Sequence, residues 1–145
     1  MSAVILALML LFLQEGRKVQ GQAELAAIRS TLGALRTAAI LQDLQVKASG
    51  RQGNAGATVV NPFDLMRVRP ANYLGAMDAA QALTARSGSW LFDTDCVCAT
   101  YVPLEPRWLD SPAGASALRF RVRSGAGPLV LDALEPYLWQ GRAVD

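Results

Sequence analysis

Two cysteines separated by one residue are the side chains with the clearest potential for chemistry. Cys96 and Cys98 fall within an expected strand, where residues two apart share a face. They lie too close along an extended backbone to bond easily to each other, which favours two buried thiols. In an oxidising compartment, a strained bridge or a bond to another chain is the alternative. We therefore treat Cys96 and Cys98 as a candidate redox pair.

The chain contains no histidine, and this limits both metal binding and catalysis. It removes the commonest general base, the serine–histidine triad and histidine metal sites. With only two cysteines, a zinc site is not expected. No carboxylate pair is placed for acid–base work, and no glycine-rich phosphate loop is present. We expect no catalytic residue, no metal, no cofactor and no enzymatic activity.

Acidic and basic side chains of the C-terminal half suggest ligands only weakly. Asp93, Asp95 and Asp110 provide carboxylates, but their spacing matches no calcium-binding loop. Asp93-Thr94-Asp95 is typical of a solvated turn. Three arginines alternate within residues 117–123, which is the pattern of a solvated strand face. With 14 basic and 12 acidic residues the chain carries a net charge of +2, which gives no reason to expect nucleic acid as a partner.

The N-terminus carries a run of eleven apolar residues, 3–13, with the sequence AVILALMLLFL. As a helix it would measure about 17 Å, whereas a bilayer core is about 30 Å thick. Three interpretations remain open: a buried core helix, half of a membrane anchor, or an anchor whose beginning lies outside this sequence.

Residues 14–49 have the pattern of an amphipathic helix. This segment lacks proline and is rich in Ala, Leu, Gln, Glu and Arg. Apolar residues recur at steps of three and four on one face: Leu25, Ile28, Leu32, Leu35 and Ala39. Together with the apolar run, the helix would approach about 45 residues, bend or partly melt at Gly16, and stop at residues 48–50.

Residues 50–145 are expected to form a globular head. A loop over 50–58 is followed by a short helix capped by Asn61, then by an alanine-rich connector over 76–87. Short apolar or alternating segments then predict strands at residues 90–92, 96–102, 117–123 and 129–131. Trp90, Trp108 and Trp139 are expected in the core or in subunit contacts. The expected fold is α+β, with one long N-terminal helix packed on an antiparallel sheet of three to four strands.

The order of these parts resembles type IV pilins and type II secretion pseudopilins. Residues 31–38 (TLGALRTA) resemble the helical stretch before a pilin head. Similarity to minor pilin-like heads, including those of mannose-sensitive-haemagglutinin-type pili, comes from several short segments: 61–63 (NPF), 72–75 (NYLG), 88–93 (GSWLFD) and 101–103 (YVP). The resemblance covers nearly the whole chain and depends mainly on the order and spacing of these segments.

This resemblance implies a truncated apolar stem over 1–13, an amphipathic helix over 14–49 and a head over 50–145. It also implies a minor pilin or pseudopilin anchored in the bacterial inner membrane as a single-pass protein. The head would then lie in the periplasm or on an extracellular filament. Its expected partners are other pilin or pseudopilin subunits, the inner membrane and the pilus or secretion assembly machinery. Within each subunit, the sheet of the head would pack on one helix face, formed by Leu25, Ile28, Leu32 and Leu35.

One departure concerns the N-terminus. Family members begin with a basic leader that ends in glycine, followed by a segment like FTLIE, and neither occurs here. The expectation is therefore a truncated sequence or a leaderless paralogue. The alternative function is a small soluble or peripheral α+β binding module in which residues 1–13 belong to the core.

Overall fold

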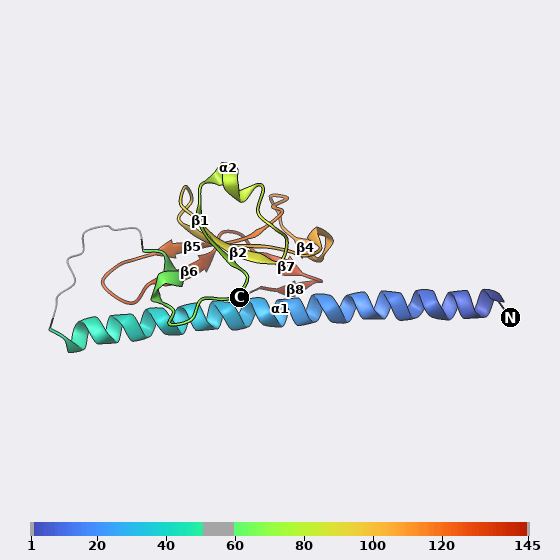
Figure 1. Ribbon diagram of the computed structural model, residues 1–145, viewed down its shortest axis with the longest axis horizontal. Coiled ribbons are helices and arrows are strands. Elements are labelled where there is room, and N and C mark those ends of the chain that lie inside the picture. Colours follow the sequence, from blue (N-terminus) through green and yellow to red (C-terminus); the bar gives the residue numbers. More distant parts are fainter. Residues whose placement is uncertain (1, 51–59, 145) are drawn as a thin grey trace.

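A computed structural model describes residues 2–50 and 60–144 of the chain. A single long helix, α1 (Ser2–Ala48), underlies a β-rich head, as Figure 1 shows. The head rests on the C-terminal half of α1, and the N-terminal half projects away from it. Most of the expected loop over 50–58 lies outside the described residues.

The helix α1 is 47 residues long and continues through Gly16 without a break, so the bend expected there is absent. Nothing in its sequence interrupts the backbone hydrogen bonds, because it contains no proline. It stops where the sequence predicts, at Ala48, and Gly50 follows with a φ of 65°. Glycine adopts this left-handed conformation without the steric cost that other residues meet.

The main sheet has five strands in the order β1-β2-β3-β5-β6. A hairpin of β2 (Ser89–Asp93) and β3 (Cys98–Val102) forms its centre, and β5 (Leu118–Arg123) and β6 (Val130–Ala133) extend it with antiparallel pairing. On the other side, β1 (Tyr73–Met77) pairs parallel to β2. The expectation of a purely antiparallel sheet of three to four strands is therefore wrong, because the sheet is mixed and has five strands.

The additional strand, β1, contains Gly75, a residue type that commonly ends strands. Gly75 has a φ of 106°, and the register with β2 shifts between Tyr73 and Ala76. A bulge of this kind lets a strand pass through a glycine without ending. After β1, the expected connector contains a short helix, α2 (Ala79–Ala82), which Asp78 and Gln81 cap reciprocally.

Three very short strands form a second sheet, in the order β4-β7-β8. They are β4 (Leu109–Asp110), β7 (Leu138–Trp139) and β8 (Arg142–Ala143), and all are too short to show a periodic pattern. Two 3-10 turns, η1 (Pro62–Leu65) and η2 (Pro106–Trp108), complete the head. The side chain of Asn61 accepts a hydrogen bond from the backbone N–H of Phe63, which confirms its predicted capping role.

The core lies between α1 and the face of the main sheet that is turned toward it. Side chains from α1 meet those of β2, β3 and β5, which alternate toward the helix. The three tryptophans expected in the core are all buried: Trp90, Trp108 and Trp139. Figure 1 shows the short helix α2 on the side of the main sheet that faces away from α1.

Candidate functional site: an exposed stem held to the head

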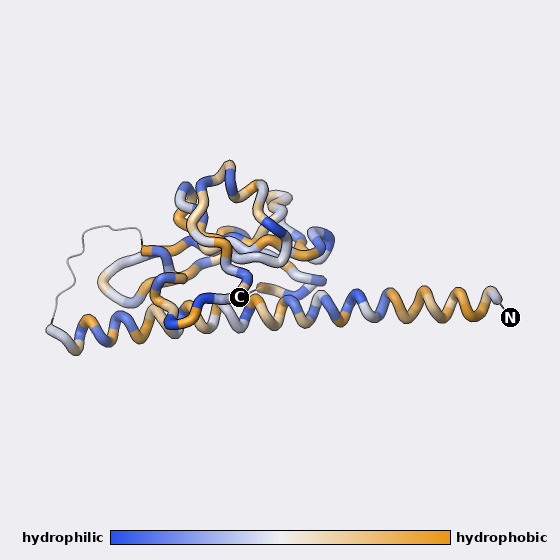
Figure 2. The backbone as a smooth tube through the Cα atoms, viewed as in Figure 1, coloured by the Kyte–Doolittle hydropathy of each residue, from blue (hydrophilic) through white to orange (hydrophobic). Residues whose placement is uncertain are grey.

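The apolar run at the N-terminus is fully accessible in this chain. Residues 2–20 are all exposed, and the large apolar side chains of residues 4–13 are 51–79% exposed. Figure 2 shows these residues as a hydrophobic end of α1 beyond the head. We call residues 3–13 the stem. The stem contributes nothing to the core of the head, so its interpretation as a buried core helix, which the binding-module alternative required, is wrong.

Within residues 2–50 and 60–144, no helix combines the length and the apolar character needed to cross a membrane.

The next part of α1 packs against the head through one face. The structure buries Leu25, Ile28, Leu32 and Leu35, each 0–3% exposed, at the centre of the hydrophobic core. Ala39 extends the same face and is also buried. These side chains therefore contact their own sheet and are not available to other molecules.

A buried carboxylate lies on that same helix face. Oε1 of Glu24 accepts a hydrogen bond from the Tyr101 hydroxyl (2.7 Å) and another from the Leu104 backbone N–H (2.9 Å). Oε2 is buried and has no partner among the described residues. Burial, followed by the hydrogen bond to Glu24 and its charge, raises the pKa of Tyr101 above its ordinary value. The hydroxyl therefore remains a donor to the carboxylate at neutral pH.

Two further polar contacts tie α1 to the head near Glu24. The Trp139 indole N–H donates to the backbone carbonyl of Gly21 (2.8 Å). The guanidinium of Arg29 donates to the carbonyl of Ala143 (2.6 Å). We call the contacts of Gly21, Glu24 and Arg29 with the head the latch. The latch fixes α1 where the helix first contacts the head, several residues after the stem ends.

Sequence reasoning did not identify the latch, although one signal was present. Glu24 precedes Ile28 by four residues and Leu35 by eleven, so helical spacing places it on the apolar face. A charged residue at an apolar position indicates a buried partner. The positions of Tyr101 and Trp139 relative to the helix depend on long-range packing and leave no local signal.

The two cysteines form a disulfide bond, so the expectation of two separate thiols is wrong. Their Cα atoms are 5.3 Å apart. The physical reason is that Cys96 and Val97 belong to the turn between β2 and β3 and not to a strand. Val97 has a φ of 57°, and this left-handed conformation turns the two side chains toward each other.

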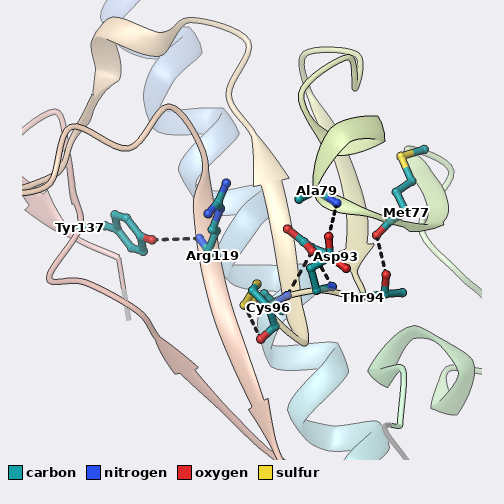
Figure 3. The surroundings of a disulfide bond; sticks show 9 residues. Met77, Ala79, Asp93, Thr94, Cys96, Arg119 and Tyr137 are labelled. Atoms are coloured by element: carbon teal, nitrogen blue, oxygen red, sulfur yellow. Dashed lines mark hydrogen bonds between the residues drawn. A yellow bond between two sulfur atoms is a disulfide. The ribbon is translucent and has the colours of Figure 1, made fainter.

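The aspartates of this region stabilise the same turn, as Figure 3 shows. Oδ1 of Asp93 accepts hydrogen bonds from the backbone N–H groups of Asp95 (3.0 Å) and Cys96 (3.3 Å). Asp93 is buried, so the expected turn is present but this residue is not solvated. Asp110 lies apart from the turn, in β4. Within the described chain, no three His, Cys, Asp or Glu side chains are grouped to hold a metal ion.

The three alternating arginines of β5 differ in their surroundings. Arg121 and Arg123 are exposed, and Arg123 forms an ion pair with Asp132 on the neighbouring strand. Arg119 is half-buried, and its Nε has no hydrogen-bond partner among the described residues. The face is therefore only partly the solvated surface that the sequence predicted.

Comparison of the chain with models of known protein families, with curated proteins and with solved structures finds no match.

Proposed function

We propose that this chain is a structural subunit of a pilin-like assembly, a minor pilin or pseudopilin of a type IV pilus or a type II secretion filament. The observation that carries the proposal is the stem, an apolar helical end that projects from a folded head and that the head leaves uncovered. In this role the stem lies in the inner membrane or among the stems of other subunits. The head lies in the periplasm or on an extracellular filament.

The size of the exposed apolar surface supports a stem that is buried in a membrane or against other subunits when the protein functions. Nine large apolar side chains of the stem are more than half exposed. Moving them out of water would contribute on the order of 10 kcal/mol, since one such side chain contributes about 1.5–3 kcal/mol when fully buried. Contiguous apolar surface of this kind marks sites of protein or membrane interaction.

The continuity of α1 supports a mechanical role. The stem and the buried segment belong to one uninterrupted helix, so a force on the stem passes directly into the head. The latch resists sliding of the helix along the sheet, because Glu24 and Gly21 are bound to residues on different strands, Tyr101 and Trp139. A subunit held by its helix and displayed by its head needs this kind of coupling.

The order of the elements along the chain also supports the proposal. A long N-terminal helix precedes a head whose sheet packs on the C-terminal half of that helix. In this role the proposed partners are other pilin or pseudopilin subunits and the assembly machinery of the inner membrane. The function is assembly, and it requires no catalytic group.

Fractionation of cells that produce the protein tests the proposal. The wild-type chain should remain in the membrane or filament pellet after carbonate extraction. Replacing two stem residues, Leu6→Lys with Leu10→Lys, should release it to the soluble fraction. The matched control places the same charges on the exposed head residues Val68 and Leu83 and should behave as wild type. A wild-type chain found soluble and monomeric would contradict the proposal.

A further inference from the structure

The disulfide bond constrains the turn between β2 and β3. It joins residues on either side of Val97, whose φ of 57° lies in the left-handed region. Residues branched at Cβ rarely adopt this conformation, because the side chain crowds the backbone. The carbonyl of Val97 also accepts a hydrogen bond from the N–H of Val122 (2.9 Å), which ties the turn to β5. The turn therefore holds an unfavourable backbone conformation next to a covalent bond.

The two cysteines differ in their accessibility. Cys96 is half-buried at the surface of the turn, whereas Cys98 is fully buried at the start of β3. Thiol–disulfide exchange depends on access to the sulfur that is attacked. An external thiolate would therefore reach Cys96 and not Cys98.

We propose that the Cys96–Cys98 bond is a thiol–disulfide exchange site, opened by a dithiol reductant that attacks Sγ of Cys96. In the first step a sulfur–sulfur bond forms between the dithiol and Cys96, the bond to Cys98 breaks, and its electron pair stays on Sγ of Cys98. In the second step the other thiolate of the dithiol attacks its own sulfur bound to Cys96 and releases the Cys96 thiolate. The dithiol becomes a disulfide, and its two protons end on the two cysteine thiols.

The surroundings favour a stable opened form. Sγ of Cys98 lies 3.2 Å from the carbonyl oxygen of Cys96, so the reduced thiol has a hydrogen-bond acceptor in place. Opening the bond also removes the covalent constraint that keeps Val97 in the left-handed region.

The turn is connected to a second segment of the head, as Figure 3 shows. The backbone N–H of Thr94 donates to the carbonyl of Met77 (2.9 Å). Oδ2 of Asp95 accepts from the backbone N–H of Ala79 (2.9 Å). A turn freed by reduction loosens these two contacts, which join it to the end of β1 and to the start of α2.

A redox titration of the full chain tests the proposal, with dithiothreitol as the reductant and alkylation followed by mass spectrometry as the readout. In the folded wild-type protein both cysteines should become alkylated as the dithiol concentration rises. Asparagine tolerates the left-handed region, so Val97→Asn makes the backbone conformation of the oxidised turn less unfavourable and the bond harder to reduce. The dithiol concentration at half-reduction should therefore rise by on the order of tenfold. The control Val68→Asn, at an exposed position, should leave the dithiol concentration at half-reduction unchanged.

Three results of the titration would overturn the proposal. They are two free thiols in protein never exposed to a reductant, a bond that opens only when the chain unfolds, and an unchanged half-reduction point in Val97→Asn.

A pair of serine variants tests which sulfur is attacked. Cys98→Ser leaves the accessible Cys96, which should react quickly with an aromatic disulfide reagent in the folded protein. Cys96→Ser leaves the buried Cys98, which should react at least tenfold more slowly. Equal rates would contradict attack at Cys96. Because these measurements need neither a membrane nor a filament, their outcome is independent of the proposed assembly function.

Discussion

Replacing Glu24 by alanine should weaken the attachment of α1 to the head. The change leaves the Tyr101 hydroxyl and the Leu104 N–H without their acceptor. An unsatisfied buried donor costs about 1–3 kcal/mol. The full cost applies to the Tyr101 hydroxyl, whose hydrogen bond is buried, and a smaller one to the Leu104 amide, whose hydrogen bond is part-buried. Removal of the unpartnered Oε2 offsets part of the loss. We expect the free energy of unfolding to fall by about 2–3 kcal/mol.

Replacing Glu24 by glutamine provides the matched comparison. The amide oxygen can accept both hydrogen bonds, and the NH₂ group takes the place of an oxygen that has no partner. The free energy of unfolding should therefore stay within about 1 kcal/mol of wild type. Tyr101→Phe should cost about 1 kcal/mol, because it removes one of the two hydrogen bonds that Glu24 accepts.

Urea unfolding of the full chain in a mild nonionic detergent measures these differences through tryptophan fluorescence, since all three tryptophans lie in the head core. Glu15→Ala, at an exposed position before the latch, is the control and should change stability by less than about 0.5 kcal/mol. A loss in Glu24→Ala no larger than that of the control would refute the latch. So would equal losses in Glu24→Ala and Glu24→Gln.

Three further predictions concern the tyrosines, the core and the second latch contact. Burial is the largest cause that raises the pKa of Tyr73, Tyr101 and Tyr137 above the ordinary value of 10.0. As the pH rises past 10, the phenols of the unfolded chain therefore ionise before those of the folded chain. Stability is then fully present below pH 10 and falls as the pH rises further, and urea midpoints at pH 8–11 should fall less steeply in Tyr101→Phe. Leu32→Ala, in the core, should cost about 2–5 kcal/mol in the same unfolding assay, whereas Leu41→Ala, on the exposed side of α1, should cost less than about 0.5 kcal/mol. Trp139→Phe should cost about 2–3 kcal/mol, because it removes the hydrogen bond to Gly21 and leaves a void in the core where the larger ring is buried. An effect of Leu41→Ala as large as that of Leu32→Ala would contradict the assigned core face.

Local patterns predicted the parts of the fold that local physics determines. The steps of three and four that join Leu25 to Leu35 follow from the period of the helix, so they identify its buried face. The alternation in residues 118–123 does the same for β5, whose apolar side chains are buried. The end of α1 before Gly50 follows from the conformational freedom of glycine.

Features that depend on distant parts of the chain could not be predicted in the same way. The parallel pairing of β1 with β2 brings together segments separated by α2, and the bulge at Gly75 hides the strand from a search for regular alternation. The disulfide depends on the left-handed conformation of Val97, which its residue type does not favour. The acceptor role of Glu24 depends on how β3 lies against α1.

Photo-crosslinking from the stem in living cells tests the central claim most directly. A benzophenone amino acid at Leu10, which is exposed in the isolated chain, reports what covers the stem, and the same group at Leu83 of the head is the control. The account predicts adducts from Leu10 with lipid or with other filament subunits, and none of these from Leu83. Adducts from Leu10 to the head of its own chain alone, or no adducts at all, would contradict it.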